Sequence, residues 1–171
     1  MFAEDGIVVS GGNFHAQPIA LVMDYLKTAV AEVASISERR TYLLLDGHRS
    51  GLPSFLAGSP GLESGLMMVQ VLAAALVSEN KVLAHPASVD SIPTSAGMED
   101  HVSMAPVAAR HAIQIIENAG YVVAVELLVA SQGLSLAEPL DPGKGVQEVL
   151  GLVRQVVPVL EADRPTSQDI E

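Results

Sequence analysis

Apolar residues recur every three or four positions in the first part of the chain, which is the spacing of one face of an α-helix. This pattern predicts a helix over residues 17–45, with Pro18 in its first turn, where the missing N–H is no loss. A helix this long is well above the mean of about 11–12 residues, and such helices are typical of bundles. The apolar stripe consists of Ile19, Val22, Met23, Leu26, Val30, Val33 and Ile36, whereas Asp24, Lys27, Thr28, Glu32 and Ser35 lie mostly off it.

A second helix is predicted over residues 60–83, and its apolar side chains cover nearly every face. Ser59 suits the N-cap of this helix, and Pro60 suits its first helical position. A helix that is apolar all round must be covered on all sides. Since a chain of 171 residues offers few helices to cover it, we expect a homo-oligomer.

Two further helices are predicted, a long one over residues 102–137 and a shorter amphipathic one over residues 146–160. Residues 1–16 form a lead-in, in which residues 7–9 are expected to pair as a strand, and residues 163–171 form a polar tail. No internal repeat, low-complexity segment or linker marks a second domain. We therefore predict an all-α, long-helix bundle that forms a single helical domain over residues 1–171.

The stretch between the second and third helices, residues 84–101, fits neither a helix nor a strand. Pro86 and Pro93 remove backbone donors and favour extended geometry in the residues before them. Hydroxyl, imidazole and carboxylate side chains crowd into the stretch, while apolar spacers argue against disorder. Because a polar loop this long between helices is uncommon unless it is functional or disordered, we interpret it as an ordered loop that carries the chemistry.

The charge balance narrows the classes of partner. Nine Lys and Arg residues stand against 20 Asp and Glu residues, a formal net charge of −11. No basic stripe is available to neutralise phosphates, which argues against nucleic acid and against an anionic membrane surface. The amino terminus lacks a signal-peptide pattern, no uncharged apolar run is long enough to span a bilayer, and there is no Cys. We expect a soluble, cytoplasmic chain.

Two groups of residues can carry chemistry, and each has an ordinary structural alternative. Glu99 heads the third helix together with Asp100 and His101. A carboxylate there can act as a base or hold a cationic or imidazole group, or the acidic residues can simply face the helix dipole. Asn13 and Phe14 follow two glycines, where an amide and a ring can wall a pocket or merely start a helix. The histidines lack zinc-binding spacing, so no metal site is predicted.

Longer motifs run through the chain in order. The longest is His85-Pro86-Ala87-Ser88-Val89-Asp90-Ser91-Ile92-Pro93-Thr94-Ser95, followed by Glu99-Asp100-His101-Val102-Ser103-Met104. Shorter ones are Ser-Gly-Gly-Asn-Phe-His at 10–15, Ser-Glu-Arg-Arg at 37–40, Ser-Gly-Leu-Pro at 50–53 and Ser-Glu-Asn-Lys at 78–81, with looser ones at 163–165 and 169–171. Together they resemble the histidine ammonia-lyase branch of the aromatic amino acid lyases. The resemblance covers nearly the whole chain, but only the carboxyl-terminal portion of a usual family member.

This resemblance implies a mostly helical homotetramer with a central helix bundle and active sites assembled from several subunits. It implies that Phe14, beside Asn13, lines the substrate pocket, and that Glu99 faces the substrate imidazole or assists proton removal. Gly97 and Met98 depart from the family, which has more polar residues there. The family's electrophile, a methylidene-imidazolone, forms from an internal Ala-Ser-Gly, which this sequence lacks. It also lacks the segments that supply the family's catalytic tyrosine and the arginine that holds the substrate carboxylate.

Two hypotheses follow from the sequence. In the first, the chain is one part of a split histidine ammonia-lyase that converts L-histidine to urocanate and ammonia. An amino-terminal lyase chain then supplies the electrophile, and this chain alone is inactive. In the second, the chain is a non-catalytic helical assembly or regulatory subunit. A different reaction in the retained pocket is a further alternative.

Overall fold

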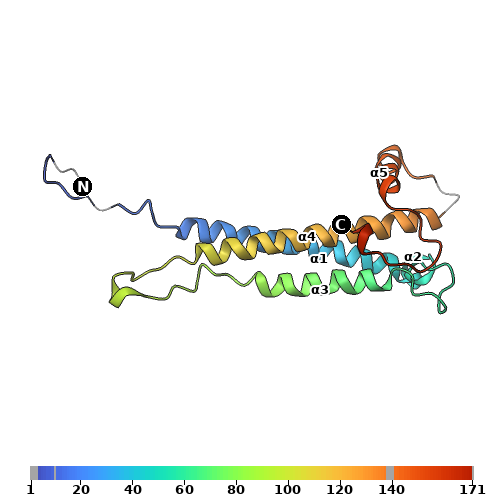
Figure 1. Cartoon of the computed structure of the whole chain (residues 1–171), viewed down its shortest axis with the longest axis horizontal. Coiled ribbons are helices and arrows are strands. Elements are labelled where there is room, and N and C mark those ends of the chain that lie inside the picture. Colours follow the sequence, from blue (N-terminus) through green and yellow to red (C-terminus); the bar gives the residue numbers. More distant parts are fainter. Residues whose placement is uncertain (1–3, 10, 138–140, 171) are drawn as a thin grey trace.

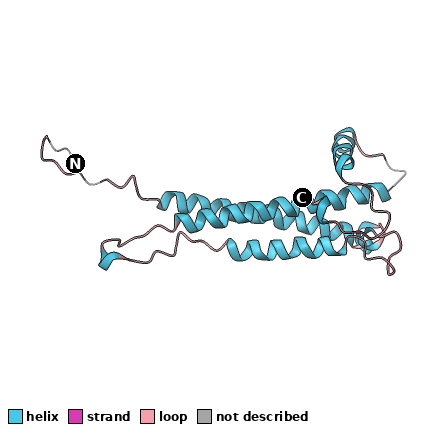
Figure 2. Cartoon of the chain, in the orientation of Figure 1, coloured by secondary structure: helices cyan, strands magenta, loops and turns pink. Residues whose placement is uncertain are grey.

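The structure, a computed structural model, describes residues 4–9, 11–137 and 141–170. In these ranges the regular structure is helical, so the predicted all-α class is confirmed (Figure 2). Residues 7–9 do not form the expected strand. The long helices are α1 (Gln17–Leu45), α3 (Met67–Leu83) and α4 (Ala105–Leu136), and the shorter elements are α2 (Gly47–Ser50), α5 (Lys144–Val156) and the 3-10 turns η1 (Ser54–Leu56), η2 (Ser95–Gly97) and η3 (Ser167–Asp169).

The three long helices lie side by side as one elongated bundle (Figure 1). α1 and α4 run in the same direction, because Ala20 packs near Ala105 at one end and Ser37 meets Val122 further along. α3 runs the opposite way between its two loops. The lead-in and the loop after α3 therefore share one end of the bundle, whereas α2, α5 and the carboxyl-terminal residues share the other.

The second helix begins at Met67 and not at residue 60, so this predicted boundary is wrong. Gly61 and Gly65 adopt left-handed φ values of 93° and 55°, which a continuing right-handed helix does not allow. The backbone N–H of Ser59 donates to the Glu63 carboxylate at 2.9 Å, in place of a Ser59 side-chain cap. Residues 60–66 are consequently turns that lead into α3.

The predicted bounds of the last two helices also need correction. α4 begins at Ala105 and ends at Leu136, inside the predicted range of 102–137. α5 ends at Val156, four residues before the predicted end, because Pro158 lacks the N–H and favours extended geometry at Val157. The chain beyond α5 instead forms a strap without α-helix, residues 157–170, which contains η3.

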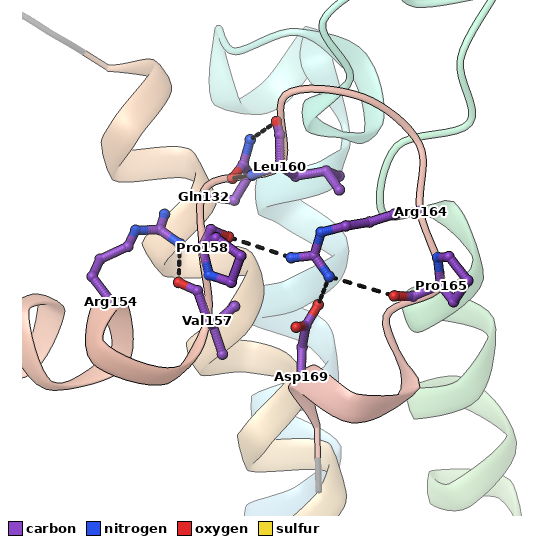
Figure 3. A network of polar contacts seen from close by, with 8 residues as sticks. All are labelled: Gln132, Arg154, Val157, Pro158, Leu160, Arg164, Pro165 and Asp169. Atoms are coloured by element: carbon purple, nitrogen blue, oxygen red, sulfur yellow. Dashed lines mark hydrogen bonds and ion pairs between the residues drawn. The ribbon is translucent and has the colours of Figure 1, made fainter.

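This strap crosses the far end of the bundle and is fixed by polar contacts (Figure 3). The buried Gln132 amide makes two bonds with the backbone of Leu160, each 3.0 Å. Arg164 Nη1 donates to the Asp169 carboxylate at 2.5 Å. Upstream, the Asp163 carboxylate accepts 2.8 Å bonds from two backbone N–H groups just before α3. The strap thus joins α4 to the start of α3.

α1 packs its polar side against its own chain, the reverse of a usual amphipathic helix. Its buried residues include Asp24, Lys27, Ser37, Glu38 and Thr41. Most of its predicted apolar stripe is exposed, including Ile19 at 55%, Val22 at 60% and Val33 at 57%. Large apolar residues of α3 and α4 are exposed as well, among them Met68, Val71, Ile113 and Ile116.

In the described ranges, α4 is one helix that is long and apolar enough to cross a bilayer, by length and composition alone. Core helices of soluble proteins pass the same test, and α4 buries side chains such as Ile115, Val122 and Val129 in its own bundle. This feature is therefore weak evidence for a membrane span.

Candidate functional site

The predicted functional loop leaves the end of α3, extends along the start of α1 and returns to α4 (Figure 1). Its base is held by a buried ion pair on α1. Lys27 Nζ lies 2.7 Å from Asp24 Oδ1 and donates to the His85 carbonyl oxygen at 2.9 Å. Asp24 Oδ2 accepts the backbone N–H of Ser88 at 2.7 Å. Both charged residues are buried, since Lys27 is 0% and Asp24 is 7% exposed.

The Asp24 carboxyl shows how strongly these contacts act. Burial by itself raises the pKa of a carboxyl group, because it penalises the charged form. The hydrogen bonds from Lys27 and Ser88 outweigh this effect and lower the pKa of Asp24 from 3.8 to about 2. Asp24 is therefore ionised at neutral pH and holds the base of the loop as a carboxylate.

The outer part of the loop is a hairpin-like turn that carries Glu99. The backbone N–H of Thr94 donates to the Glu99 carbonyl oxygen at 3.1 Å across the turn. Ser95 and Ala96 adopt left-handed φ values of 51° and 56°. Left-handed geometry is uncommon for residues with a Cβ, and such strain often accompanies functional segments. Glu99 thus lies in this turn, before α4 begins at Ala105, and the prediction that it heads this helix is wrong.

The three predicted site residues lie at the same end of the bundle and face solvent. Phe14 is 88% exposed, and Asn13 and Glu99 are exposed as well. The lead-in meets the loop through His15, whose Nε2 lies 2.8 Å from the His101 carbonyl oxygen. An exposed carboxylate and an exposed ring are available to another molecule, but in this chain they are not enclosed as an active site would be.

Sequence reasoning missed the residues that hold this site together. Asp24 and Lys27 were predicted only to lie off the apolar stripe of α1, and the Gln17 amide, which donates to the Ser88 carbonyl at 2.8 Å, was not singled out. The available signal was an Asp and a Lys three positions apart, on one helix face. It does not show that the face is buried, because the covering loop lies some 60 residues away.

Comparison with known proteins identifies the family of this chain. The model of the family described as aromatic amino acid lyase matches residues 1–155. The chain belongs to this family, and the resemblance noted in its motifs is confirmed. Among relatives, the histidine ammonia-lyase of Desulfotalea psychrophila is 52% identical over all of this chain, and that of Deinococcus radiodurans is 57% identical over 99% of it. The chain spans about a third of the length of these relatives.

Solved structures show the same fold. Histidine ammonia-lyase from Trypanosoma cruzi is 49% identical, with a TM-score of 0.92 over 97% of this chain and 33% of that protein. Pantoea agglomerans phenylalanine aminomutase is 32% identical, with a TM-score of 0.90 over 98% of this chain and 33% of that protein. The arrangement of α1, α3 and α4 is therefore shared with enzymes of different named activities, and the fold alone does not define the reaction.

Proposed function

We propose that this chain is one part of a split histidine ammonia-lyase-like enzyme that converts L-histidine to urocanate and ammonia. The observation that carries the proposal is identity of 52–57% to histidine ammonia-lyases over essentially the whole chain. The chain spans about a third of the length of those enzymes. We propose that an amino-terminal lyase chain supplies the remaining parts of the site.

In this proposal Glu99 and Phe14 are the contribution of this chain to the substrate pocket. The Glu99 carboxylate accepts a proton from the substrate or holds its imidazole. The Phe14 ring, beside Asn13, supplies an apolar wall. The sequence contains no Ala-Ser-Gly, so its residues do not fit the family's methylidene-imidazolone, and the partner would supply this electrophile to activate the substrate amino group.

The exposed apolar faces support an assembly. Monomeric soluble proteins rarely expose large contiguous apolar patches, yet α1 leaves most of its apolar stripe uncovered while it buries Asp24 and Lys27. We propose that further copies of this chain cover these faces in a tetramer-like homo-oligomer, and that the assembly is cytoplasmic. Chemical cross-linking and light scattering of the purified chain test this part directly.

The first test is to isolate the tagged chain from its native host and identify co-purifying proteins by mass spectrometry. A stoichiometric partner that contains Ala-Ser-Gly supports the proposal, whereas a chain that purifies only with itself counts against it. The chain alone should not form urocanate, which absorbs in the ultraviolet. Urocanate formation by the pure chain would contradict the need for a partner.

The second test is Glu99→Gln in the reconstituted complex. Removing a general base or acid costs about 10²–10⁴-fold in rate, so we expect a loss in kcat of this order, with the complex still assembled. Glu148→Gln on the outer face of α5, also exposed, is the matched control and should leave kcat unchanged. A fully active Glu99→Gln complex would remove Glu99 from its proposed role.

A second candidate is a non-catalytic assembly or regulatory subunit, and the exposure of Phe14 and Glu99 favours it. A cavity of about 370 Å³, lined by residues such as Tyr42, His48 and Gln70, lies near α2 at the opposite end of the bundle.

Thermal stabilisation by L-histidine or urocanate that Phe14→Ala abolishes would contradict a purely structural role. It would also leave room for a different reaction in the retained pocket.

A further inference from the structure

His15 joins the segment that carries Phe14 to the segment that carries Glu99. It follows Phe14 in the lead-in, and the residue that it contacts, His101, lies two positions after Glu99. The His15 and His101 rings stack with their centroids 5.5 Å apart and their planes within 4°. His15 Nε2 also lies 2.8 Å from the His101 carbonyl oxygen. The His15 side chain thus makes two contacts to His101, in the part of the loop that leads back to α4.

The second ring nitrogen of His15 is engaged by α1. The backbone N–H of Gln17 donates to His15 Nδ1 at 3.2 Å. The first N–H groups of a helix have no partner within the helix, and the N-cap Ala16 offers no side chain to satisfy them. The His15 ring therefore serves as a cap for α1 while it contacts the loop.

These two contacts require one form of the ring. A neutral imidazole has one N–H donor and one acceptor nitrogen. Because Nδ1 accepts from Gln17, the proton resides on Nε2, which then donates to the His101 carbonyl oxygen. The other tautomer would place two N–H groups opposite one another at Gln17 and leave the His101 carbonyl without a donor.

The other contacts of the loop fix its first part to α1 or link its two parts to each other. The Gln17 side chain and the Asp24 carboxylate both bind the backbone of Ser88, in the part of the loop that follows α3. Ser91 Oγ accepts the backbone N–H of Val102 at 2.8 Å and links the two parts to each other. His15 connects His101, in the part of the loop that leads back to α4, directly to the lead-in.

We propose that His15 is a positioning residue, which in its neutral Nε2–H form fixes the Glu99 segment relative to Phe14. That His15 fixes the Glu99 segment is a proposal about the structure of the free chain only. Its consequence for catalysis rests on the proposed lyase function.

The test compares His15→Gln with His15→Asn by amide hydrogen exchange of the full chain. The side-chain amide of Gln reaches the place of Nε2, whereas that of Asn reaches only the place of Nδ1. A lost hydrogen bond of about 0.5–1.5 kcal/mol predicts exchange about 2–10-fold faster at residues 98–102 in His15→Asn. His15→Gln should restore most of this protection. His48→Asn, an exposed histidine at the far end, is the control and should change nothing at 98–102.

A nitrogen-15 NMR spectrum of the wild-type imidazoles supplies a readout that needs no variant. We expect His15 to carry its proton on Nε2. A proton on Nδ1, or unchanged exchange at residues 98–102 in His15→Asn, would overturn the proposal.

These readouts involve no reaction, so they separate this proposal from the proposed function. Suppose that the exchange and tautomer results are as expected while Glu99→Gln keeps full activity in the complex. The positioning role of His15 is then correct, and the proposed lyase role of Glu99 is wrong. If both hold, His15→Asn should lower kcat/KM of the complex by about 2–10-fold, and His15→Gln should recover it.

Discussion

At the loop end of the molecule the buried apolar cluster consists of four alanines, whereas the cluster nearer the strap contains Leu, Val and Ile side chains. An Ala side chain buries little apolar surface, and each buried CH₂ contributes about 0.8 kcal/mol. The loop end is instead held by the Asp24–Lys27 pair and its bonds to the loop. The strap is held at its buried side by the neutral Gln132 amide and by Val157, Leu160 and Ile170. The Arg164–Asp169 pair and the Asp163 carboxylate add charged contacts.

This difference shows that one chain uses two means of fixing a segment without regular structure. Loop placement depends on a buried ion pair. Strap placement combines a buried neutral amide and apolar packing with the contacts of Asp163 and of the Arg164–Asp169 pair. The two ends should therefore respond differently to substitution and to pH.

Lys27→Met should have the largest effect. It leaves the Asp24 carboxylate buried without its cation, and breaking a buried pair in this way costs about 3–5 kcal/mol. Urea unfolding measures the loss in free energy of unfolding. Lys81→Met, at an exposed lysine of α3, is the matched control and should change stability by less than about 0.5 kcal/mol. Equal effects of the two substitutions would show that the pair does not hold the loop end.

Acid should weaken the loop end next. The folded pKa of Asp24, about 2, lies below its ordinary value of 3.8, so its contribution is fully present above about pH 4 and is lost as the pH falls toward 2. The contribution amounts to about 2 kcal/mol. The gap in unfolding free energy between wild type and Asp24→Asn should narrow over this interval. A gap that stays constant from neutral pH to pH about 2 would contradict the assignment.

Gln132→Leu tests the strap. It leaves the Leu160 backbone N–H and carbonyl without their partners, at a cost of about 1–3 kcal/mol. Amide exchange should accelerate in residues 157–170, while residues 84–104 keep their protection. Gln147→Leu on exposed α5 is the control. Loss of protection at both ends would show that they are not independent.

Ala96→Gly should have the smallest effect and the opposite sign. Ala96 has a φ of 56°, and left-handed geometry costs an L-residue roughly 1–2 kcal/mol that Gly avoids. Because Gly also loses more conformational freedom on folding, we expect a net gain below about 1 kcal/mol in thermal unfolding. Ala74→Gly, at an exposed position inside α3, should instead destabilise the chain by about 0.5–1 kcal/mol.

Much of the architecture follows from local patterns in the sequence. The apolar spacing in residues 17–45 identifies α1. Pro86 lies just after the end of α3, and Pro93 disfavours helix further along the loop. Both signals are local, because helix formation and its interruption depend on neighbouring residues. The motifs at 10–15 and 85–104 identify the family and direct attention to Phe14 and Glu99. The start of α3 was misplaced, because the left-handed geometry of Gly61 and Gly65 outweighs the Ser-Pro signal before them.

Tertiary structure alone decided which face of α1 is buried. The sequence shows an apolar stripe and a polar side, and burial of the stripe is the usual outcome. Here α1 buries Asp24 and Lys27, because the loop residues His85 and Ser88 satisfy their hydrogen bonds. The role of His15 arises in the same way, from a carbonyl 86 positions along the chain. Helix formation depends on neighbours in the sequence, whereas the burial of charge depends on partners that only the folded chain brings together.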